Sequence, residues 1–382
     1  MAASHPFDDG WFTTTIVSLV YPLGPAAIIL MPMILGGLVD GYGYTEQQAA
    51  NIAAAEGMGL VVASLAASLW IRHVSWVRAL LAGCLAYAVL NVASANLEAY
   101  GPLLAMRFVT GLAGGCVFAV AVAALGDNRQ PDRAFGLAQA VQGVVMLVLF
   151  FLSPYLLEAA GVGALYGMLA VVALLTLLAL GWYPSSGSPR SHGGAAPLAT
   201  SHTRLITLGL VASIVYFVNV FGLWAFIERI GQGAGLEPAT IGLALGLSQV
   251  VAIGGALAAT WAGDRFGRYR PLLIVLVGQC AAIYALLGAF GAPLYFVVTG
   301  VFQALFIVAV SYQMGAIAKL DVQGRWLVMM TGAQGFGSAL GPAVVATLIG
   351  EGGDYQGVLY LAAACCVVGT LAFLWIIRSS RL

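Results

Sequence analysis

Twelve apolar segments, each long enough to cross a lipid bilayer, follow one another along this chain of 382 residues. A helix advances about 1.5 Å per residue and needs about 20 apolar residues to span the hydrocarbon core. Charged residues make up only 8% of the chain, so a soluble fold would expose large apolar surfaces to water. We therefore predict an all-α membrane protein with twelve transmembrane helices. The predicted helices are 12–38, 46–71, 77–97, 101–124, 133–157, 163–183, 205–231, 239–262, 271–290, 293–318, 326–349 and 356–377.

A polar stretch rich in serine, glycine and proline separates the first six segments from the last six. It contains Ser185-Ser186-Gly187-Ser188-Pro189 and Gly193-Gly194, which is the composition of a flexible linker. We predict an N-terminal six-helix bundle over 1–183, a cytoplasmic linker over 184–203 and a C-terminal six-helix bundle over 204–382.

The two halves also repeat one another at an offset of about 192 residues. Arg133 matches Arg325, and Ala140-Val141-Gln142-Gly143 matches Gly332-Ala333-Gln334-Gly335. These matches indicate a duplicated six-helix unit, so the two bundles are expected to be pseudo-symmetric. Transporters built from such repeats bind their substrate near the membrane midplane, where the repeats meet.

Basic residues indicate which loops face the cytoplasm. All but two of the 15 Lys and Arg residues, Arg107 and Arg229, fall in loops or termini on one side of the predicted bundle. The loops on the other side are acidic or neutral. Because cytoplasmic loops carry the excess of Lys and Arg, we predict a multi-pass protein of the cytoplasmic (inner) membrane with both termini in the cytoplasm.

The composition and motifs also argue against several classes of function. The net charge is zero, which gives no attraction to nucleic acid. The chain contains no G-x-x-x-x-G-K-[ST] nucleotide-binding loop and no C-x-x-C pair, and its four histidines have no metal-ligand spacing. We predict no enzyme activity, no cofactor and no metal site, and we expect a monomer embedded in the lipid bilayer.

A charged loop and a helix motif carry a resemblance to a known family. Gly263-Asp264-Arg265-Phe266-Gly267-Arg268-Tyr269-Arg270 resembles the G-x-x-x-D-R-x-G-R-[RK] loop of the major facilitator superfamily. Arg107-Phe108-Val109-Thr110-Gly111-Leu112-Ala113-Gly114-Gly115 resembles the R-x-x-x-G-x-x-x-G motif in the fourth helix of that family. The resemblance implies the same fold and transport by alternating access, with Asp264, Arg265 and Arg268 as a gate latch. The corresponding loop of the first half, 69–78, keeps basic residues but lacks the Asp and the Gly.

Glu56 is the only acidic residue predicted to lie far from both membrane surfaces. It lies about eleven residues into its helix, or roughly 16 Å from the outer end, and Arg107 lies roughly 10 Å from the same surface. A buried carboxylate needs a partner or a cavity, and these two side chains are long enough to meet. Glu56 could then carry a proton, or the pair could only hold the N-terminal half together. Arg107 could alternatively bind an anionic group of the substrate.

Polar side chains at mid-helix positions mark the predicted substrate cavity. Gln142 and Gln334 occupy equivalent places in the repeat, and two facing amides would suit a polar substrate. Each glutamine could instead make an interhelical hydrogen bond, worth about 0.6 kcal/mol on average. The predicted substrate-binding residues are Tyr21, Gln139, Gln142, Tyr216, Asn219, Gln303, Tyr312 and Gln334.

These features together predict a secondary active transporter for a small organic solute, coupled to protons through Glu56 and Arg107. The alternatives are an uncoupled facilitator or organic-anion exchanger that uses Arg107 as the substrate anchor, or a multidrug-type efflux pump. A membrane enzyme or receptor would need several acids or nucleophiles at one depth, and the chain offers only Glu56 there.

Overall fold

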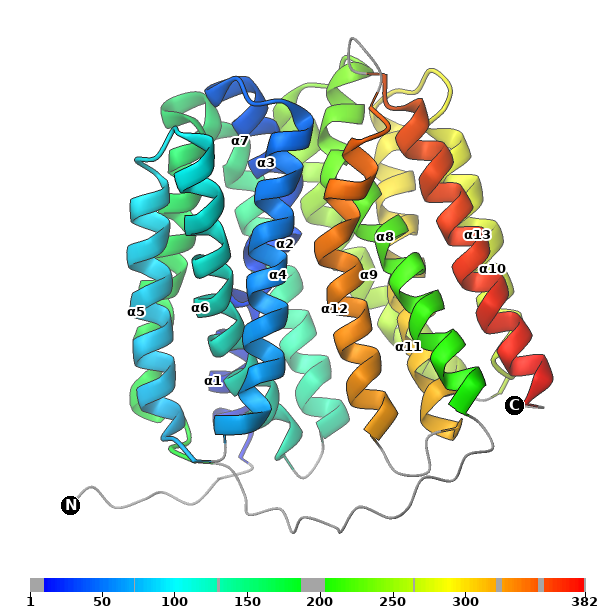
Figure 1. The fold of residues 1–382 in the computed structure, drawn as a ribbon, viewed down its shortest axis with the longest axis horizontal. Helices are drawn as coiled ribbons and strands as arrows, with labels where there is room; N and C mark the ends of the chain where they lie inside the picture. The colour runs from blue at the N-terminus through cyan, green and yellow to red at the C-terminus, as the bar shows by residue number, and fades with distance from the viewer. Residues whose placement is uncertain are drawn as a thin grey trace. The chain divides into compact units, whose positions relative to one another are not determined.

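The structure is a computed structural model, and every helix or strand element that it gives for the described residues is a helix (Figure 1). The chain divides into two compact units, unit 1 over 1–191 and unit 2 over 192–382. Their boundary lies inside the predicted linker, whose residues 187–202 are outside the described part of the chain. The structure describes residues 10–71, 73–128, 131–186, 203–263, 265–320, 325–349 and 354–380.

Unit 1 is built from long helices that follow the predicted spans, except in its first segment. The capping box at the start of α4 shows how the sequence sets a helix end: the Thr45 hydroxyl accepts from the Gln48 backbone N–H, and the Gln48 side chain accepts from the Thr45 N–H. The helices described in this unit are α1 (Trp11–Val20), η1 (Tyr21–Leu23), α2 (Ala26–Ile29), α3 (Met31–Tyr42), α4 (Glu46–Trp70), α5 (Trp76–Ser94), α6 (Tyr100–Gly126), α7 (Pro131–Leu177) and η2 (Leu180–Trp182).

The first predicted span, 12–38, is a series of short helices rather than one continuous helix. Proline lacks a backbone N–H and its ring clashes with the carbonyl four residues earlier, so it interrupts a helix. Pro22 lies in η1, Pro25 precedes α2, and Pro32 is the second residue of α3. Pro22 and Pro25 account for the first interruption, and a further one lies at Leu30, between α2 and α3.

Helix α7 covers the fifth and sixth predicted spans and is interrupted between them. Ala160 has φ −150° and ψ 18°, and Gly161 has φ 66° and ψ −166°. A positive φ of this kind is readily adopted only by glycine. The interruption lies between the predicted spans 133–157 and 163–183, so α7 consists of two helical parts that meet at Gly161.

Unit 2 repeats the helix order of unit 1 with the same spacing. Helix α4 begins at residue 46 and α9 at 238, and α6 begins at 100 and α11 at 292, so each pair is 192 residues apart. The helices described in this unit are α8 (Thr203–Gly233), α9 (Pro238–Ala262), α10 (Tyr269–Ala285), α11 (Ala292–Leu320), α12 (Arg325–Ala346) and α13 (Gln356–Ser379).

Eight helices of the described residues are long and apolar enough to cross a membrane, with the two parts of α7 counted as one. The first segment of the chain and α10 are apolar but shorter. Equivalent helices pack against one another in the two units: α4 lies against α6 in unit 1, and α9 lies against α11 in unit 2. Glycines make both contacts possible, because a helix without Cβ atoms at the contact allows its neighbour to approach.

Two adjacent glycines of α9 test this packing directly. A Cβ atom at Gly255 would lie 2.4 Å from the carbonyl oxygen of Ala304 in α11, whereas a Cβ atom at Gly254 would meet nothing within 4 Å. We expect Gly255→Ala to destabilise the protein by about 1–2 kcal/mol through overpacking. Gly254→Ala should be neutral or stabilising by up to about 1 kcal/mol, because alanine favours helix more than glycine does. Thermal unfolding of the two purified variants in detergent measures the difference, and equal midpoints would contradict the prediction.

Candidate functional site

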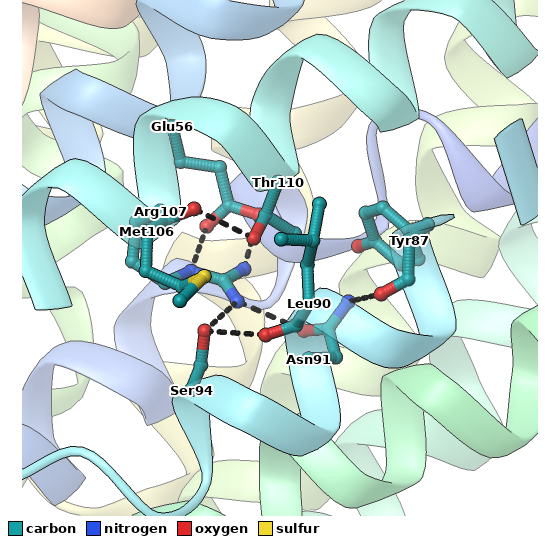
Figure 2. Close-up of polar contacts among 8 residues, drawn as sticks. All are labelled: Glu56, Tyr87, Leu90, Asn91, Ser94, Met106, Arg107 and Thr110. Atoms are coloured by element: carbon teal, nitrogen blue, oxygen red, sulfur yellow. Dashed lines mark hydrogen bonds and ion pairs between the residues drawn. The ribbon is translucent and has the colours of Figure 1, made fainter. Parts of the chain in front are cut away.

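A buried ion pair between Glu56 of α4 and Arg107 of α6 lies in the core of unit 1. Arg107 Nε donates to Glu56 Oε2 at 3.1 Å, and Arg107 Nη2 donates to Glu56 Oε1. Figure 2 shows the carboxylate facing the guanidinium in this two-point contact. Arg107 has no exposed surface, and Glu56 is 7% exposed. Bidentate pairs of this type are among the strongest hydrogen-bonded contacts in proteins, and they fix the orientation of both groups.

The pair is possible because the backbones of α4 and α6 touch beside it. A Cβ atom at Gly111 would lie 2.0 Å from the carbonyl oxygen of Glu56, and one at Gly115 would lie 2.6 Å from that of Leu60. From the other side, a Cβ atom at Gly59 would lie 2.1 Å from a carbonyl oxygen of α6. The R-x-x-x-G-x-x-x-G motif therefore holds Arg107 about one turn from the closest contact with α4.

Two polar side chains of α5 supply further acceptors to Arg107. Arg107 Nη1 donates to Asn91 Oδ1 at 2.9 Å and to Ser94 Oγ at 3.3 Å. Each acceptor is oriented by its own helix, since the Asn91 amide donates to the carbonyl of Tyr87 at 2.8 Å and the Ser94 hydroxyl donates to that of Leu90 at 2.8 Å. Both side chains are fully buried. The guanidinium thus has a set of neutral oxygen partners in addition to the carboxylate (Figure 2).

An aromatic ring from the second part of α7 completes the surroundings of Arg107. Its guanidinium carbon lies 4.4 Å from the centre of the Tyr166 ring, which is within the range of a cation–π contact. On the other side, Glu56 lines a narrow pocket with apolar residues of α2, α3 and α4, including Ala27, Met31 and Ile52. Glu56 is the only ionisable residue in that lining. Among the described residues, the carboxylate therefore has Arg107 as its charged partner and also borders this narrow pocket.

The equivalent positions of unit 2 carry no charge. The offset of 192 takes Glu56 to Ser248 and Arg107 to Thr299, and both hydroxyls donate to carbonyls of their own helices, at 2.7 and 2.8 Å. The same offset takes Asn91 and Ser94 to apolar residues, which line a small apolar pocket together with Thr299. The apolar residues at these positions are Ile283 and Leu286. The charged cluster thus has no counterpart at the repeat positions.

Comparison with models of protein families identifies the family of this chain. Residues 14–210 and 209–381 each match the family model described as Major Facilitator Superfamily. The chain belongs to the major facilitator superfamily. No curated protein sequence matches it significantly.

Solved structures of the major facilitator superfamily share the fold. A D-xylose–proton symporter superposes with a TM-score of 0.74 at 14% sequence identity, over 95% of this chain and 96% of the symporter. The nucleoside transporter NupG superposes with a TM-score of 0.76 at 12% identity, over 97% and 100% of the two chains. A bacterial homologue of the human lysosomal transporter Spinster gives 0.70 at 14% identity, over 99% and 98%. The chain is thus a membrane-embedded secondary transporter with the major facilitator fold.

The substrate-binding residues predicted in unit 1 differ in their surroundings. Tyr21 is buried in η1 and packs against the ring of Phe118, with 5.2 Å between the ring centres. Gln139 of α7 has an exposed side chain. Gln142 lies one turn further along the helix and is half-buried, and its Oε1 has no hydrogen-bond partner among the described residues. Of the three, Gln142 retains a buried acceptor that a substrate could use.

In unit 2 the predicted substrate-binding residues of α8, α11 and α12 are all buried, and two of them are already engaged. The Tyr216 hydroxyl donates to Gln279 Oε1 at 2.9 Å, and the Tyr312 hydroxyl donates to the carbonyl of Gly263 at 2.9 Å. Tyr312 therefore lies beside the charged loop rather than among mid-helix residues. Asn219 lacks a partner for either amide atom, and Gln334 lacks one for Nε2, within the described structure.

The other predicted residue of unit 2, Gln303, is also buried, in α11. The predicted face-to-face arrangement of Gln142 and Gln334 across the halves stays a prediction. The same holds for a substrate-binding role of each residue in this set.

The predicted gate latch lies at the loop between α9 and α10. Asp264 itself is outside the described residues. The guanidinium carbon of Arg265 lies 5.3 Å from the centre of the Trp261 ring. Arg268 lines a surface pocket together with Gly263, Tyr312 and other residues of α9 and α11. The latch role of the three charged residues stays a prediction.

Three members of the cluster around Arg107 were not predicted from the sequence, namely Asn91, Ser94 and Tyr166. A signal was present for the first two, because they are three residues apart in a predicted membrane helix and so share one helix face. Tyr166 gave no comparable signal, since an aromatic residue in an apolar span ordinarily packs as part of the core.

Proposed function

We propose that this transporter moves a small organic solute across the cytoplasmic membrane by alternating access, and that protonation of Glu56 couples transport to the proton gradient. The observation that carries the proposal is the second set of partners around Arg107. When a proton neutralises the carboxylate, the guanidinium still has the Asn91 and Ser94 oxygens and the Tyr166 ring. A buried cation left without any partner would be costly, so these groups allow Arg107 to stay buried when Glu56 carries a proton.

The contact that breaks on protonation joins two helices. Glu56 belongs to α4, whereas the remaining partners of Arg107 belong to α5 and α7. A neutral carboxyl group is held less strongly than a carboxylate, so protonation frees α4 to move relative to α6. Protonation then changes the relative free energies of two conformations of unit 1. Coupling of transport to protons requires such a change.

The same geometry weighs against an anion exchanger in which Arg107 anchors the substrate. Arg107 has no exposed surface, and each of its three side-chain nitrogens already donates to a protein oxygen. A substrate carboxylate would have to displace Glu56 inside the core of unit 1. The predicted orientation, with both termini in the cytoplasm, remains part of the proposal and rests on the distribution of basic residues.

Transport of an identified substrate tests the proposal. A thermal-shift screen of the purified protein against metabolites, including D-xylose and nucleosides because structurally similar transporters are named for them, finds a ligand that raises the unfolding temperature. Uptake of that ligand into proteoliposomes is then measured with and without an inward proton gradient. We expect the gradient to drive accumulation by the unmodified protein.

Glu56→Gln is expected to abolish gradient-driven accumulation while leaving exchange of substrate across the membrane. The amide keeps the shape of the side chain but cannot take up and release the proton. Glu158→Gln is the matched control, because Glu158 is an exposed acid in the same unit. Accumulation by Glu56→Gln at the level of the control would show that Glu56 does not couple transport to protons.

A further inference from the structure

Two phenol hydroxyls beside the ion pair have no partner in good hydrogen-bond geometry among the described residues, and the Tyr87 phenol also interacts with the Asn91 side chain. They belong to Tyr87 of α5 and Tyr166 of α7, whose side chains are fully buried. A buried hydroxyl without a protein partner is costly, and native proteins ordinarily satisfy such a group with an ordered water molecule. A phenol can both donate and accept, so it suits a site where water passes a proton onward.

The two tyrosines lie on different sides of the ion pair along α6. Tyr166 contacts Arg107 and interacts electrostatically with Tyr42 and Tyr44, at the end of unit 1 where α3 meets α4. The Tyr44 hydroxyl donates to the carbonyl of Glu98, in the loop before α6, at 2.7 Å. This is the end predicted to face outward, and Tyr166 therefore lies on the outward side of the pair.

Tyr87 lies toward the opposite end of the same helix. A Cβ atom at Gly114 would be 3.1 Å from the Tyr87 ring, so Gly114 marks the level of the ring on α6. Gly114 is seven residues beyond Arg107, or about 10 Å further from the outward end. Tyr87 also interacts electrostatically with both Glu56 and Arg107, and Figure 2 shows it beside Asn91.

We infer that the Tyr166 and Tyr87 hydroxyls bind two internal water molecules that carry protons between Glu56 and opposite ends of unit 1. The inference rests on the proposed coupling role of Glu56 and adds its access routes. In each step an O–H bond forms at the acceptor as one breaks at the donor. A phenol takes a proton from water and releases its own proton, so it is neutral before and after the transfer.

The groups that face the Glu56 carboxylate set the electrostatics of both routes. Arg107 on α6 is the cation, Tyr87 and Tyr166 are the neutral phenols from α5 and α7, and the α2 and α3 residues at the pocket are apolar. A proton that arrives by either route meets a pair with zero net charge. The carboxylate is the anion among these groups, so the inference places the proton there at the end of either route.

Infrared difference spectroscopy on the full-length protein in proteoliposomes tests the inference without a transported substrate. Acidification should produce a carboxylic acid band that Glu56→Gln lacks, together with water bands that shift in H₂¹⁸O. Tyr166→Phe and Tyr87→Phe each keep the aromatic ring and remove the hydroxyl. Each should lose a water band and slow the protonation of Glu56 after a pH jump by about tenfold, the effect of losing one hydrogen bond in the transfer path.

The two routes predict that the effect of each substitution depends on which side of the membrane is acidified. In vesicles with one protein orientation, Tyr166→Phe should slow protonation from the side of Tyr44, and Tyr87→Phe from the opposite side. Tyr183→Phe is the control, because Tyr183 is buried in the same unit and its hydroxyl donates to the carbonyl of Val120 at 3.5 Å. Unchanged water bands and unchanged protonation rates in both variants overturn the inference.

Failure of the inference can be told apart from failure of the proposed function. If the unmodified protein and Glu56→Gln give the same carboxylic acid bands, the Glu56 carboxylate does not titrate and the proposed coupling fails. If that band is present but both tyrosine variants behave as Tyr183→Phe does, Glu56 takes up protons by another path and only the water sites are wrong.

Discussion

Arg107→Met should destabilise the protein by about 3–5 kcal/mol, the cost of leaving one member of a buried ion pair without the other. Met has nearly the length of the aliphatic part of Arg but no donors. The Glu56 carboxylate would lose the donors that contact both of its oxygens, and the pocket beside it offers only apolar neighbours among the described residues. Thermal unfolding of the purified variant in detergent measures the loss.

Removing the charge of Glu56 instead should destabilise the protein much less. In Glu56→Gln, Arg107 keeps its bonds to Asn91 and Ser94 and its contact with Tyr166, and the new amide oxygen can still accept from the guanidinium. The double variant Glu56→Gln/Arg107→Met should recover most of the stability lost in Arg107→Met, because no charge then remains buried. Equal losses in the two single variants would contradict this asymmetry.

A matched control separates the buried pair from general effects of removing a positive charge. Arg78 is exposed in α5 of the same unit. Arg78→Met should change the unfolding midpoint little, since exposed charges contribute between zero and about 1 kcal/mol.

The helices were predictable because the length of an apolar run is a local property of the sequence. The predicted span 46–71 corresponds to α4 at Glu46–Trp70, and 239–262 corresponds to α9 at Pro238–Ala262. In the bilayer a helix must satisfy its own backbone hydrogen bonds, so an apolar run with polar ends leaves few alternatives. The breaks in the first span were only partly predictable, because proline marks a weak point but packing decides which backbone angles the chain takes there.

The ion pair could be predicted from the depths of its two residues, but the full set of partners around it could not. Counting residues from the helix ends placed Glu56 roughly 16 Å and Arg107 roughly 10 Å from the same membrane surface, within reach of two long side chains. The partners Asn91, Ser94 and Tyr166 depend on how α5 and α7 are rotated about their own axes. That rotation follows from packing between helices, which no single segment of the sequence encodes.

The substrate-binding set was the least predictable part for the same reason. A polar residue inside an apolar span can face a substrate, a neighbouring helix or its own backbone, and composition does not distinguish these cases. Tyr216 shows the second outcome, since its hydroxyl is bonded to Gln279 of α10. Gln142 shows that a buried acceptor can remain without a protein partner among the described residues.

Gly111→Ala should destabilise the protein by about 3 kcal/mol, at the upper end of the usual cost of overpacking. The added Cβ would lie 2.0 Å from the Glu56 carbonyl oxygen, and neither backbone can yield without separating α4 from α6. Gly136→Ala is the control, because a Cβ there would meet nothing within 4 Å in the same unit. Thermal unfolding of both variants measures the effect, and similar midpoints would show that the helix contact is looser than the structure indicates.

The same substitution should also weaken the ion pair, since Gly111 lies against the backbone of the residue that carries the carboxylate. Substitutions at sites that share a structural element are not additive. If Gly111→Ala has already moved Glu56 away from Arg107, adding Arg107→Met should cost clearly less than it does in the unmodified protein. Full additivity would mean that the pair survives the separation of α4 and α6, and the helix motif would then serve packing alone. Reduced additivity would tie the glycine of the R-x-x-x-G-x-x-x-G motif to the chemistry of Glu56.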